Sequence, residues 1–177
     1  SMILSLTNET PSRVSASGGS FLHKDIADVT TTNLEFPSGV KAHIFVSWLH
    51  PFKEQKLVAV GGSGMATFDD SQPWESKIVY YPHKVTWRDG IPVPSKADGE
   101  AVPVAQDEPL KLECQHFLDC VASRARPRTD GAEGLRVLRV LNDAQAALQR
   151  QVDGAGKTDA RGDTVPTAAE RFPGAKV

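Results

Sequence analysis

Alternating apolar and polar residues form the clearest pattern in residues 28–70, where they predict three or four antiparallel strands joined by turns. After the Pro-Ser-Gly turn at residues 37–39, every second residue is apolar: Ala42, Ile44, Val46 and Trp48. The other face of this strand carries Lys41, His43, Phe45, Ser47 and Leu49. That face is too mixed for a core and less polar than a face left to water. We therefore expect a sheet that packs helices on one face and leaves the other for a further contact.

Helical spacing follows the strands. Residues 107–109 (Asp-Glu-Pro) begin a first helix that ends near Arg126 and Pro127. Its apolar stripe consists of Cys114, Phe117, Leu118 and Val121. A second helix begins at Thr129 and Asp130, with Glu133 in a capping-box position, and its stripe consists of Leu138, Leu141, Ala144 and Leu148. Two helices joined by a short loop can cover one face of a sheet.

Shorter elements complete the predicted order. Residues 1–11 resemble the last turns of a helix that begins before the chain does, and residues 13–16 form a short strand. Residues 78–81 and 84–87 are two further strands, and the proline-rich residues 91–104 run extended along the surface. Residues 61–64 (Gly-Gly-Ser-Gly) could cradle a phosphate, but a strand pattern follows them instead of a helix, which favours a hairpin turn.

These elements predict an α+β fold: an open, largely antiparallel β-sheet with helices packed on one face and the other face available for subunit pairing or substrate. Residues 1–150 are expected to form one domain. Residues 151–177 lose all periodicity, so we expect a flexible tail or linker. The alternative for this tail is the entry into a fused β-helix acyltransferase, which residues 166–168 and 172–177 faintly resemble.

Composition narrows the function. The 177 residues, 40% of them hydrophobic, suffice for one core. A net charge of -2 gives no basic excess for nucleic acid, and no apolar run approaches the ~18 residues of a membrane span. We expect a soluble cytoplasmic protein, with no nucleic-acid or membrane partner and with Cys114 and Cys120 as reduced core thiols.

Candidate catalytic and metal-binding groups are sparse. The five histidines are scattered singly without the spacing of a zinc site, and no GxSxG elbow occurs. Asp69 and Asp70 are adjacent, so on a strand their carboxylates face opposite ways, and we interpret the pair as a turn. No residue is therefore assigned to catalysis or to a metal.

The strongest surface cluster lies in residues 48–53, where an aromatic, a histidine and a lysine occur together. An aromatic face beside cationic donors suits a sugar ring that carries phosphate or carboxylate. Two alternatives remain open here: Trp48 could continue the core face, and Lys53 could be a solvated charge.

Three segments in succession resemble the C-terminal domain of the glucose-fructose oxidoreductase and inositol dehydrogenase family, called Gfo/Idh/MocA. They are residues 27–48 (ADVTTTNLEFPSGVKAHIFVSW), residues 50–70 (HPFKEQKLVAVGGSGMATFDD) and residues 108–148 (EPLKLECQHFLDCVASRARPRTDGAEGLRVLRVLNDAQAAL). Within the family, Pro51 to Lys53, the FDD and the RPRTDG loop are most similar to dehydrogenases that oxidise UDP-N-acetylglucosaminuronate for lipopolysaccharide sugars. The resemblance covers residues 1–150.

The resemblance implies a two-domain NAD- or NADP-dependent parent enzyme that acts on a CH-OH group of a sugar. An N-terminal Rossmann domain binds the dinucleotide in that enzyme, while this domain shapes the substrate pocket and pairs subunits. The chain itself has no GxGxxG after a strand, no Glu-Lys-Pro with the family's catalytic lysine and no Asp-x-x-x-His pair. We therefore expect no cofactor in this chain and no activity from it alone.

The surface cluster and the family resemblance together predict site residues. Lys24, Trp48, His50 and Lys53 are predicted to lie near a nucleotide-sugar substrate, because cationic donors suit its negative charge. His43, Phe45 and Leu49 are predicted to form an interface of a homo-oligomer. The competing hypothesis is a stand-alone, non-catalytic sheet module for dimerisation or saccharide binding. The coding sequence upstream of Ser1 would separate the two.

Overall fold

The computed structural model describes residues 1–22 and 26–155, and the chain within it divides into two compact units. Of the described residues, the first unit combines 1–49 with 128–155, and the second unit comprises residues 50–127. Each unit is described by itself. The predicted tail lies outside the described residues, apart from the last turn of a helix that continues to residue 155.

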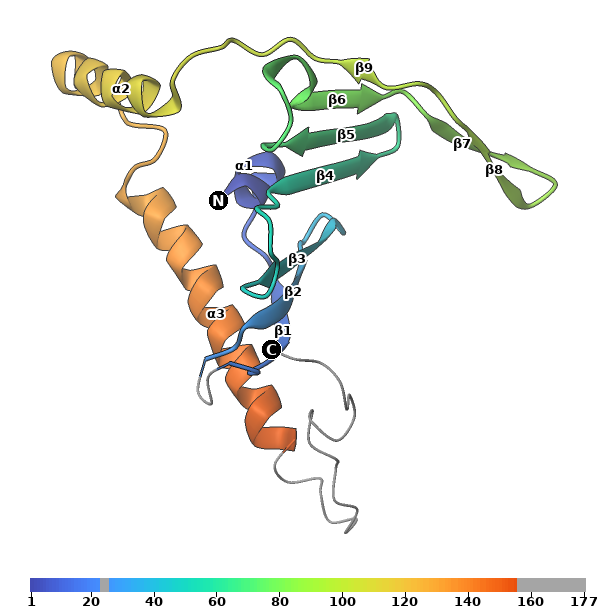
Figure 1. The fold of residues 1–177 in the computed structure, drawn as a ribbon, viewed down its shortest axis with the longest axis horizontal. Coiled ribbons are helices and arrows are strands. Elements are labelled where there is room, and N and C mark those ends of the chain that lie inside the picture. The colour runs from blue at the N-terminus through green and yellow to red at the C-terminus, as the bar shows by residue number, and fades with distance from the viewer. Residues whose placement is uncertain (23–25, 156–177) are drawn as a thin grey trace. The chain divides into compact units, whose positions relative to one another are not determined.

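The first unit is a three-stranded antiparallel sheet with helices on one face (Figure 1). Its elements are α1 (Met2–Thr7), β1 (Arg13–Gly19), β2 (Val29–Glu35), β3 (Lys41–Ser47) and α3 (Gly131–Ala155). Strand β2 is central, and the register places Val14, Leu34 and Ala42 side by side across the sheet. Because side chains alternate along a strand, these three residues share the face that the helices cover.

Leu34 is the centre of the core of this unit. It is 2% exposed and packs in one cluster with Leu4 of α1, Phe36 and Val140 of α3. Helix α1 ends where Asn8 takes a left-handed conformation, φ 53°, and donates its N–H to the Leu4 carbonyl at 2.9 Å. The predicted N-terminal helix end and the predicted turn before Val40 are both confirmed.

Helix α3 begins as the sequence predicts but presents a different stripe to the sheet. Asp130 Oδ1 accepts the N–H of Glu133 at 2.9 Å, which caps the first turn. The inward side chains are the smaller ones: Val140 and Ala147 are buried, and Val137, Ala144 and Leu148 are half-buried. The predicted stripe is therefore wrong at Leu138 and Leu141, which are both more than half exposed.

Helix α3 approaches β1 closely at Gly18. A Cβ added at Gly18 would lie 2.6 Å from the Val29 carbonyl oxygen and 3.0 Å from Leu148 Cδ1, so glycine leaves room for both β2 and the Leu148 side chain. The Gly18 N–H also donates to the Gln151 side chain at 3.0 Å. The α3 side chain that lies against Gly18 is Leu148, which belongs to the predicted stripe.

The second unit contains a four-stranded antiparallel sheet with the order β4-β5-β6-β9. These strands are β4 (Lys56–Gly61), β5 (Gly64–Asp69), β6 (Ile78–Tyr81) and β9 (Glu100–Ala101). A separate hairpin pairs β7 (Lys84–Arg88) with β8 (Ile91–Ser95). The 3-10 helix η1 (Trp74–Ser76) and the helix α2 (Pro109–Ser123) complete the unit.

Several predictions for this unit are confirmed. Gly61 pairs with Gly64 across a two-residue turn, so the glycine-rich segment is a hairpin and no helix follows it. A side chain on Gly64 would meet the Tyr81 carbonyl and the Tyr80 hydroxyl, which makes glycine necessary there. Pro109 is the first residue of α2, as expected, and both cysteines are free.

Other predictions need correction. Residues 28–70 do not form one sheet, because β2 and β3 belong to one sheet and β4 and β5 to another. Residues 91–104 are not merely extended, since β8 and β9 both pair with other strands. Cys114 is exposed instead of buried, and Phe117, Leu118 and Val121 of the predicted α2 stripe are at least half exposed. No helix in the described residues is long and apolar enough to cross a membrane.

Candidate functional site

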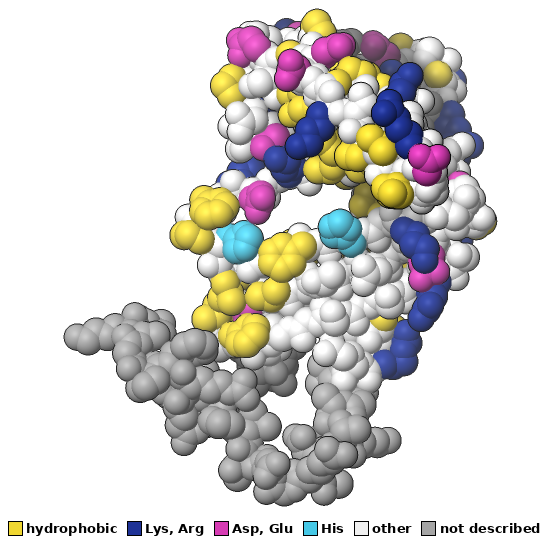
Figure 2. Space-filling view, turned by 90° about the vertical axis from the view of Figure 1, so that its right-hand side faces the viewer, with side chains coloured by type: hydrophobic (Ala, Val, Ile, Leu, Met, Phe, Trp, Pro, Cys, Tyr) yellow, Lys and Arg dark blue, Asp and Glu magenta, His cyan; other side chains and the backbone are white. Residues whose placement is uncertain are grey.

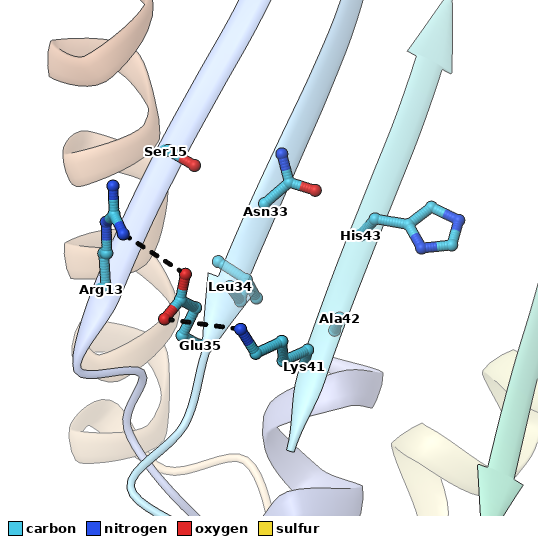
Figure 3. Close-up of a pocket in the computed structure, with 8 residues that line it drawn as sticks. All are labelled: Arg13, Ser15, Asn33, Leu34, Glu35, Lys41, Ala42 and His43. Carbon is cyan, nitrogen blue, oxygen red and sulfur yellow. Dashed lines mark ion pairs between the residues drawn. The ribbon is translucent and has the colours of Figure 1, made fainter. Parts of the chain in front are cut away.

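An open pocket of about 320 Å³ lies on the three-stranded sheet of the first unit (Figure 3). Its polar side chains are odd-numbered residues, so they occupy the face opposite the core. The lining residues are Arg13, Ser15, Asn33, Leu34, Glu35, Lys41, Ala42 and His43. The pocket is therefore on the face that the sequence leaves for a further contact.

A row of three charges crosses this pocket. Register pairs Arg13 with Glu35 and Glu35 with Lys41, so the row runs positive, negative, positive across the strands. Arg13 Nη1 lies 3.5 Å from Glu35 Oε1, and Lys41 Nζ lies 4.0 Å from Glu35 Oε2. Both ion pairs are long and solvent-exposed, so each is worth about 0–1 kcal/mol. Either cation can exchange Glu35 for a carboxylate or phosphate from outside at little cost.

The predicted interface residues fall on or next to this face. His43 lines the pocket, and Phe45 follows it on the same side of β3 with half of its surface exposed. Leu49 comes after the end of β3 and is 45% exposed. Hydrophobic side chains are visible at the surface among charged ones in Figure 2. The interface itself stays a prediction.

Asp28 is a structural hub that the sequence did not reveal. Its side chain is buried, at 3% exposure, and its Oδ2 accepts the N–H groups of Phe21 and Leu22, each at 2.6 Å. Its backbone N–H donates to the Gly19 carbonyl at 2.9 Å, and its carbonyl accepts the Trp48 N–H at 2.8 Å. One residue thus fixes the β1–β2 loop and the backbone of Trp48 together.

Trp48 stands on the surface, with 81% of its area exposed. The alternative that it continues the core face is therefore wrong in this unit. Its backbone is fixed by Asp28 while its indole ring is open to solvent, an arrangement that suits stacking on a sugar ring or a base. Substrate contact by Trp48 remains a prediction. Lys24, predicted beside it, lies outside the described residues.

His50 and Lys53 belong to the second unit, and each has a local partner. His50 Nδ1 lies 3.7 Å from Glu54 Oε2, and its ring lies 5.6 Å from the Phe52 ring. Lys53 Nζ lies 2.9 Å from Asp70 Oδ2. An anionic ligand at Lys53 must therefore compete with Asp70 for the ammonium group.

Asp70 joins two lysines. Lys77 Nζ lies 2.9 Å from Asp70 Oδ1, donates to the Asp70 carbonyl at 2.7 Å and sits 5.2 Å from the centre of the Trp74 ring. The hydrogen bonds from Lys53 and Lys77 lower the pKa of Asp70 to about 2. This cluster ties the segment before β4 to the connection between β5 and β6.

The neighbouring Asp69 has different partners. The Ser71 hydroxyl and N–H donate to Asp69 Oδ1 at 2.6 and 3.0 Å and lower the pKa of Asp69, with a smaller contribution from Lys56. The interpretation of the pair as a turn holds for Asp70, whereas Asp69 is the last residue of β5 and pairs with Lys56. No group of three or more metal-ligating side chains is arranged around a common point in the described residues.

The chain is similar to known proteins in sequence over its first part and in fold over most of its length. Residues 1–67 match the model of the GFO/IDH/MocA C-terminal domain, and no curated protein is significantly similar in sequence to the chain. The UDP-N-acetylglucosamine 3-dehydrogenase GnnA from Acidithiobacillus ferrooxidans superposes with a TM-score of 0.70 at 23% identity, over 84% of this chain and 44% of that one.

Two further solved structures give the same result. A Desulfitobacterium hafniense protein described as a candidate NADPH-dependent oxidoreductase has a TM-score of 0.62 at 18% identity, over 84% of this chain and 43% of that one. A candidate oxidoreductase from Magnetospirillum magnetotacticum has a TM-score of 0.60 at 30% identity, over 81% and 44%. The α+β fold and the family resemblance are confirmed, and the chain spans less than half the length of each of these structures.

Proposed function

Because residues 1–67 match the GFO/IDH/MocA C-terminal domain, we propose that the chain is the substrate-binding and oligomerisation half of an NAD- or NADP-dependent dehydrogenase of sugars or nucleotide sugars. In this proposal the chain alone is inert. The observation that carries it is the coverage: the likeness to GnnA takes in 84% of this chain but 44% of that enzyme. A domain of a two-domain enzyme has this relation to its relatives.

The dinucleotide belongs to the other half in this proposal. Pyrophosphate binding needs a glycine-rich turn that opens a helix, so that backbone N–H groups point at the phosphates. In the described residues the glycine-rich turn at 61–64 joins two strands, and Tyr80 donates its hydroxyl to the Ser63 carbonyl at 2.9 Å. The start of α3 is capped by the Asp130 carboxylate, which repels an anion. These residues do not fit the cofactor, so no step of the reaction is assigned to it here.

Substrate contact is proposed for Lys24, Trp48, His50 and Lys53. Trp48 offers an exposed aromatic face, and His50 and Lys53 offer hydrogen-bond donors for a phosphate or uronate. Lys53 is the weakest of these assignments because Asp70 already holds it. The nucleotide sugar is proposed from the printed substrate of GnnA, which is UDP-N-acetylglucosamine.

Self-association is proposed through the open face of the three-stranded sheet. The row of Arg13, Glu35 and Lys41 is self-complementary when two copies face each other with an offset of one strand, because Glu35 of each then meets a cation of the other. His43, Phe45 and Leu49 supply apolar and polarisable area beside it. A stand-alone sheet module would use the same face.

Ligand binding by the full chain tests the proposal. Titration calorimetry with NAD, NADP and UDP-N-acetylglucosamine should show no dinucleotide binding, and Trp48→Ala should remove any nucleotide-sugar binding while Trp87→Ala leaves it unchanged. Dinucleotide binding with a dissociation constant in the micromolar range contradicts the proposal. In sedimentation, Phe45→Glu should dissociate the oligomer and Phe117→Glu, on α2, should not. A monomeric wild type at high concentration contradicts the oligomerisation half alone.

A further inference from the structure

The β7–β8 hairpin is an isolated ribbon that extends beyond the four-stranded sheet of the second unit (Figure 1). Its two-residue turn has positive φ at both positions, 52° at Asp89 and 77° at Gly90, the geometry of a type I′ hairpin. In the described residues neither strand pairs with anything but the other. Two strands alone are marginally stable in water, so an additional strand or surface would stabilise this ribbon.

Two prolines close one edge of the ribbon. In a hairpin with a two-residue turn, the pair next to the turn, Arg88 and Ile91, exchanges hydrogen bonds, and alternate pairs after it do not. The pairs of Trp87 with Pro92 and of Val85 with Pro94 are therefore the ones whose backbone groups point outward. Proline has no N–H, so the outer edge of β8 has lost both of its donors.

The outer edge of β7 keeps every donor and acceptor. By the same alternation, Val85 and Trp87 point their N–H and C=O groups away from β8. Strand β5 pairs with β6, along the same edge, only as far as Tyr81, which lies opposite Met65. The turn between β4 and β5 follows directly, so β5 does not continue beside β7. The edge beyond Tyr81 is thus a ready-made site for one more antiparallel strand, and it is the single such edge of this ribbon in the described residues.

The side chains of β7 define what that strand must carry. Val85 and Trp87 lie on one face with Pro92 and Pro94 opposite them, and the Trp87 side chain is 71% exposed. Lys84, Thr86 and Arg88 lie on the other face. No ion pair to Lys84 or Arg88 is found in the described part of the chain. A matching strand has carboxylates next to the two cations and apolar residues next to Val85 and Trp87.

A second copy of the chain does not meet this requirement. If two β7 strands pair antiparallel with full overlap, Lys84 lies opposite the Arg88 of the other copy, twice in each pair. Like charges directly opposite each other destabilise a strand pair. In other antiparallel registers that bring the outward N–H and C=O groups of the two copies together, a β7 residue lies opposite Pro82 or opposite the turn at Asp89 and Gly90. The charges therefore favour a different protein segment.

We propose that the free edge of β7 binds an extended segment of another protein, with acidic residues at two positions four apart and apolar residues between them. The backbone of Val85 and Trp87 provides the hydrogen bonds, Lys84 and Arg88 select the carboxylates, and Trp87 with the two prolines covers the apolar side chains. This binding site is separate from the pocket on the three-stranded sheet.

Peptide titration against the full chain tests the site. A capped peptide Thr-Glu-Val-Thr-Val-Glu-Thr should bind with a dissociation constant on the order of micromolar to a few hundred micromolar and weaken with salt, whereas Thr-Lys-Val-Thr-Val-Lys-Thr should bind at least about tenfold more weakly. The double variant Lys84→Glu, Arg88→Glu should reverse this preference. The matched variant Lys96→Glu, Lys111→Glu changes the net charge equally and should leave it intact.

A backbone variant separates edge pairing from simple charge attraction. Val85→Pro removes an N–H that points away from β8, so it removes no hydrogen bond to Pro94, the residue opposite. This variant should weaken binding of the acidic peptide at least about tenfold. Circular dichroism checks that the variant is folded. Equal binding of both peptides, no binding of either, or unchanged affinity in Val85→Pro overturns the proposal. So does self-association of the wild type that Val85→Pro abolishes, because the occupant is then a second copy.

Discussion

The two units of this chain are stabilised by different means. Among the described residues of the first unit, the buried hydrophobic side chains are Leu4, Leu34, Phe36, Val140 and Ala147. In the second unit Cys120 is the single buried hydrophobic side chain among the described residues, and strand pairing and the Asp70 cluster hold the elements together. Several apolar side chains of that unit are exposed to solvent: Val58, Val60, Val85 and Trp87.

The first unit thus has a hydrophobic core, whereas much of the apolar surface of the second unit is exposed and available for a contact. Apolar area that is buried on folding stabilises a unit by itself, at roughly 25 cal/mol per Å². Apolar area that remains exposed on short strands gives no such stabilisation until another surface covers it. The first unit is therefore expected to set the stability of the isolated chain, and the second to gain stability when a partner binds.

Leu34→Ala is the largest test of this contrast. The side chain is 2% exposed at the centre of the first unit, so its truncation leaves a cavity and should lower the free energy of unfolding by about 3 kcal/mol. Val60→Ala on β4 removes an exposed apolar side chain and should change it by less than about 0.5 kcal/mol. Urea unfolding of both variants measures the difference. Equal losses would show that the second unit has a core of its own.

Asp28→Ala is expected to have the next largest effect. It leaves the N–H groups of Phe21 and Leu22 without their acceptor in a partly buried place and should cost about 1–2 kcal/mol. Asp28→Asn keeps one oxygen that can accept both bonds and should retain most of the stability. Amide hydrogen exchange at Phe21 and Leu22 reports the change directly. If both variants lose the same stability, the carboxylate charge matters more than the two hydrogen bonds.

Asp70→Asn tests the second unit and is expected to have the smallest effect, because the ion pair of Asp70 with Lys53 is open to solvent and the pair with Lys77 is only partly buried. The folded pKa of Asp70, about 2, lies below its ordinary value of 3.8. The stabilisation from this group is thus complete above pH 3.8 and disappears as the pH falls through 2. Wild type and Asp70→Asn should differ near neutral pH and converge in strong acid.

Carboxyl NMR titration of Asp70 and acid unfolding of both proteins provide the measurement. Asp98→Asn removes one carboxylate from an exposed loop and serves as the charge-matched control. An Asp70 that titrates at 3.8 in the folded chain would mean that Lys53 is available for a ligand after all.

The elements themselves could be predicted from local patterns. Turn residues such as Gly39 and Gly90 adopt the positive φ that the sequence implied, and Asp130 caps α3 as its position suggested. The choice of inner stripe on α3 could not be predicted in this way. Leu135, Leu138 and Leu141 recur with helical spacing, and so do Val137, Val140, Ala144 and Ala147. Periodicity alone does not choose between two stripes on one helix.

The candidate site shows the same limit. Neighbours in sequence, such as Trp48 and Lys53, suggested a common cluster, but they fall in different units. The contact between Lys53 and Asp70 and the row of Arg13, Glu35 and Lys41 depend on strand register, which a pattern of apolar residues fixes only once the pairing partners are known. Asp28 carries a weak signal: an aspartate between an apolar loop and a strand.

The first unit is built from two stretches of the chain that are synthesised at different times. Its sheet is complete at Ser47, but Val140, which covers Leu34, is made on the order of a hundred residues later, after roughly five to twenty seconds of translation. Throughout that interval α1 contributes Leu4 to the inner face of the sheet, but the part that α3 covers stays open. A ribosome that stalls between these points would hold a chain whose sheet lacks α3, and chaperone binding should be strongest for nascent chains of that length.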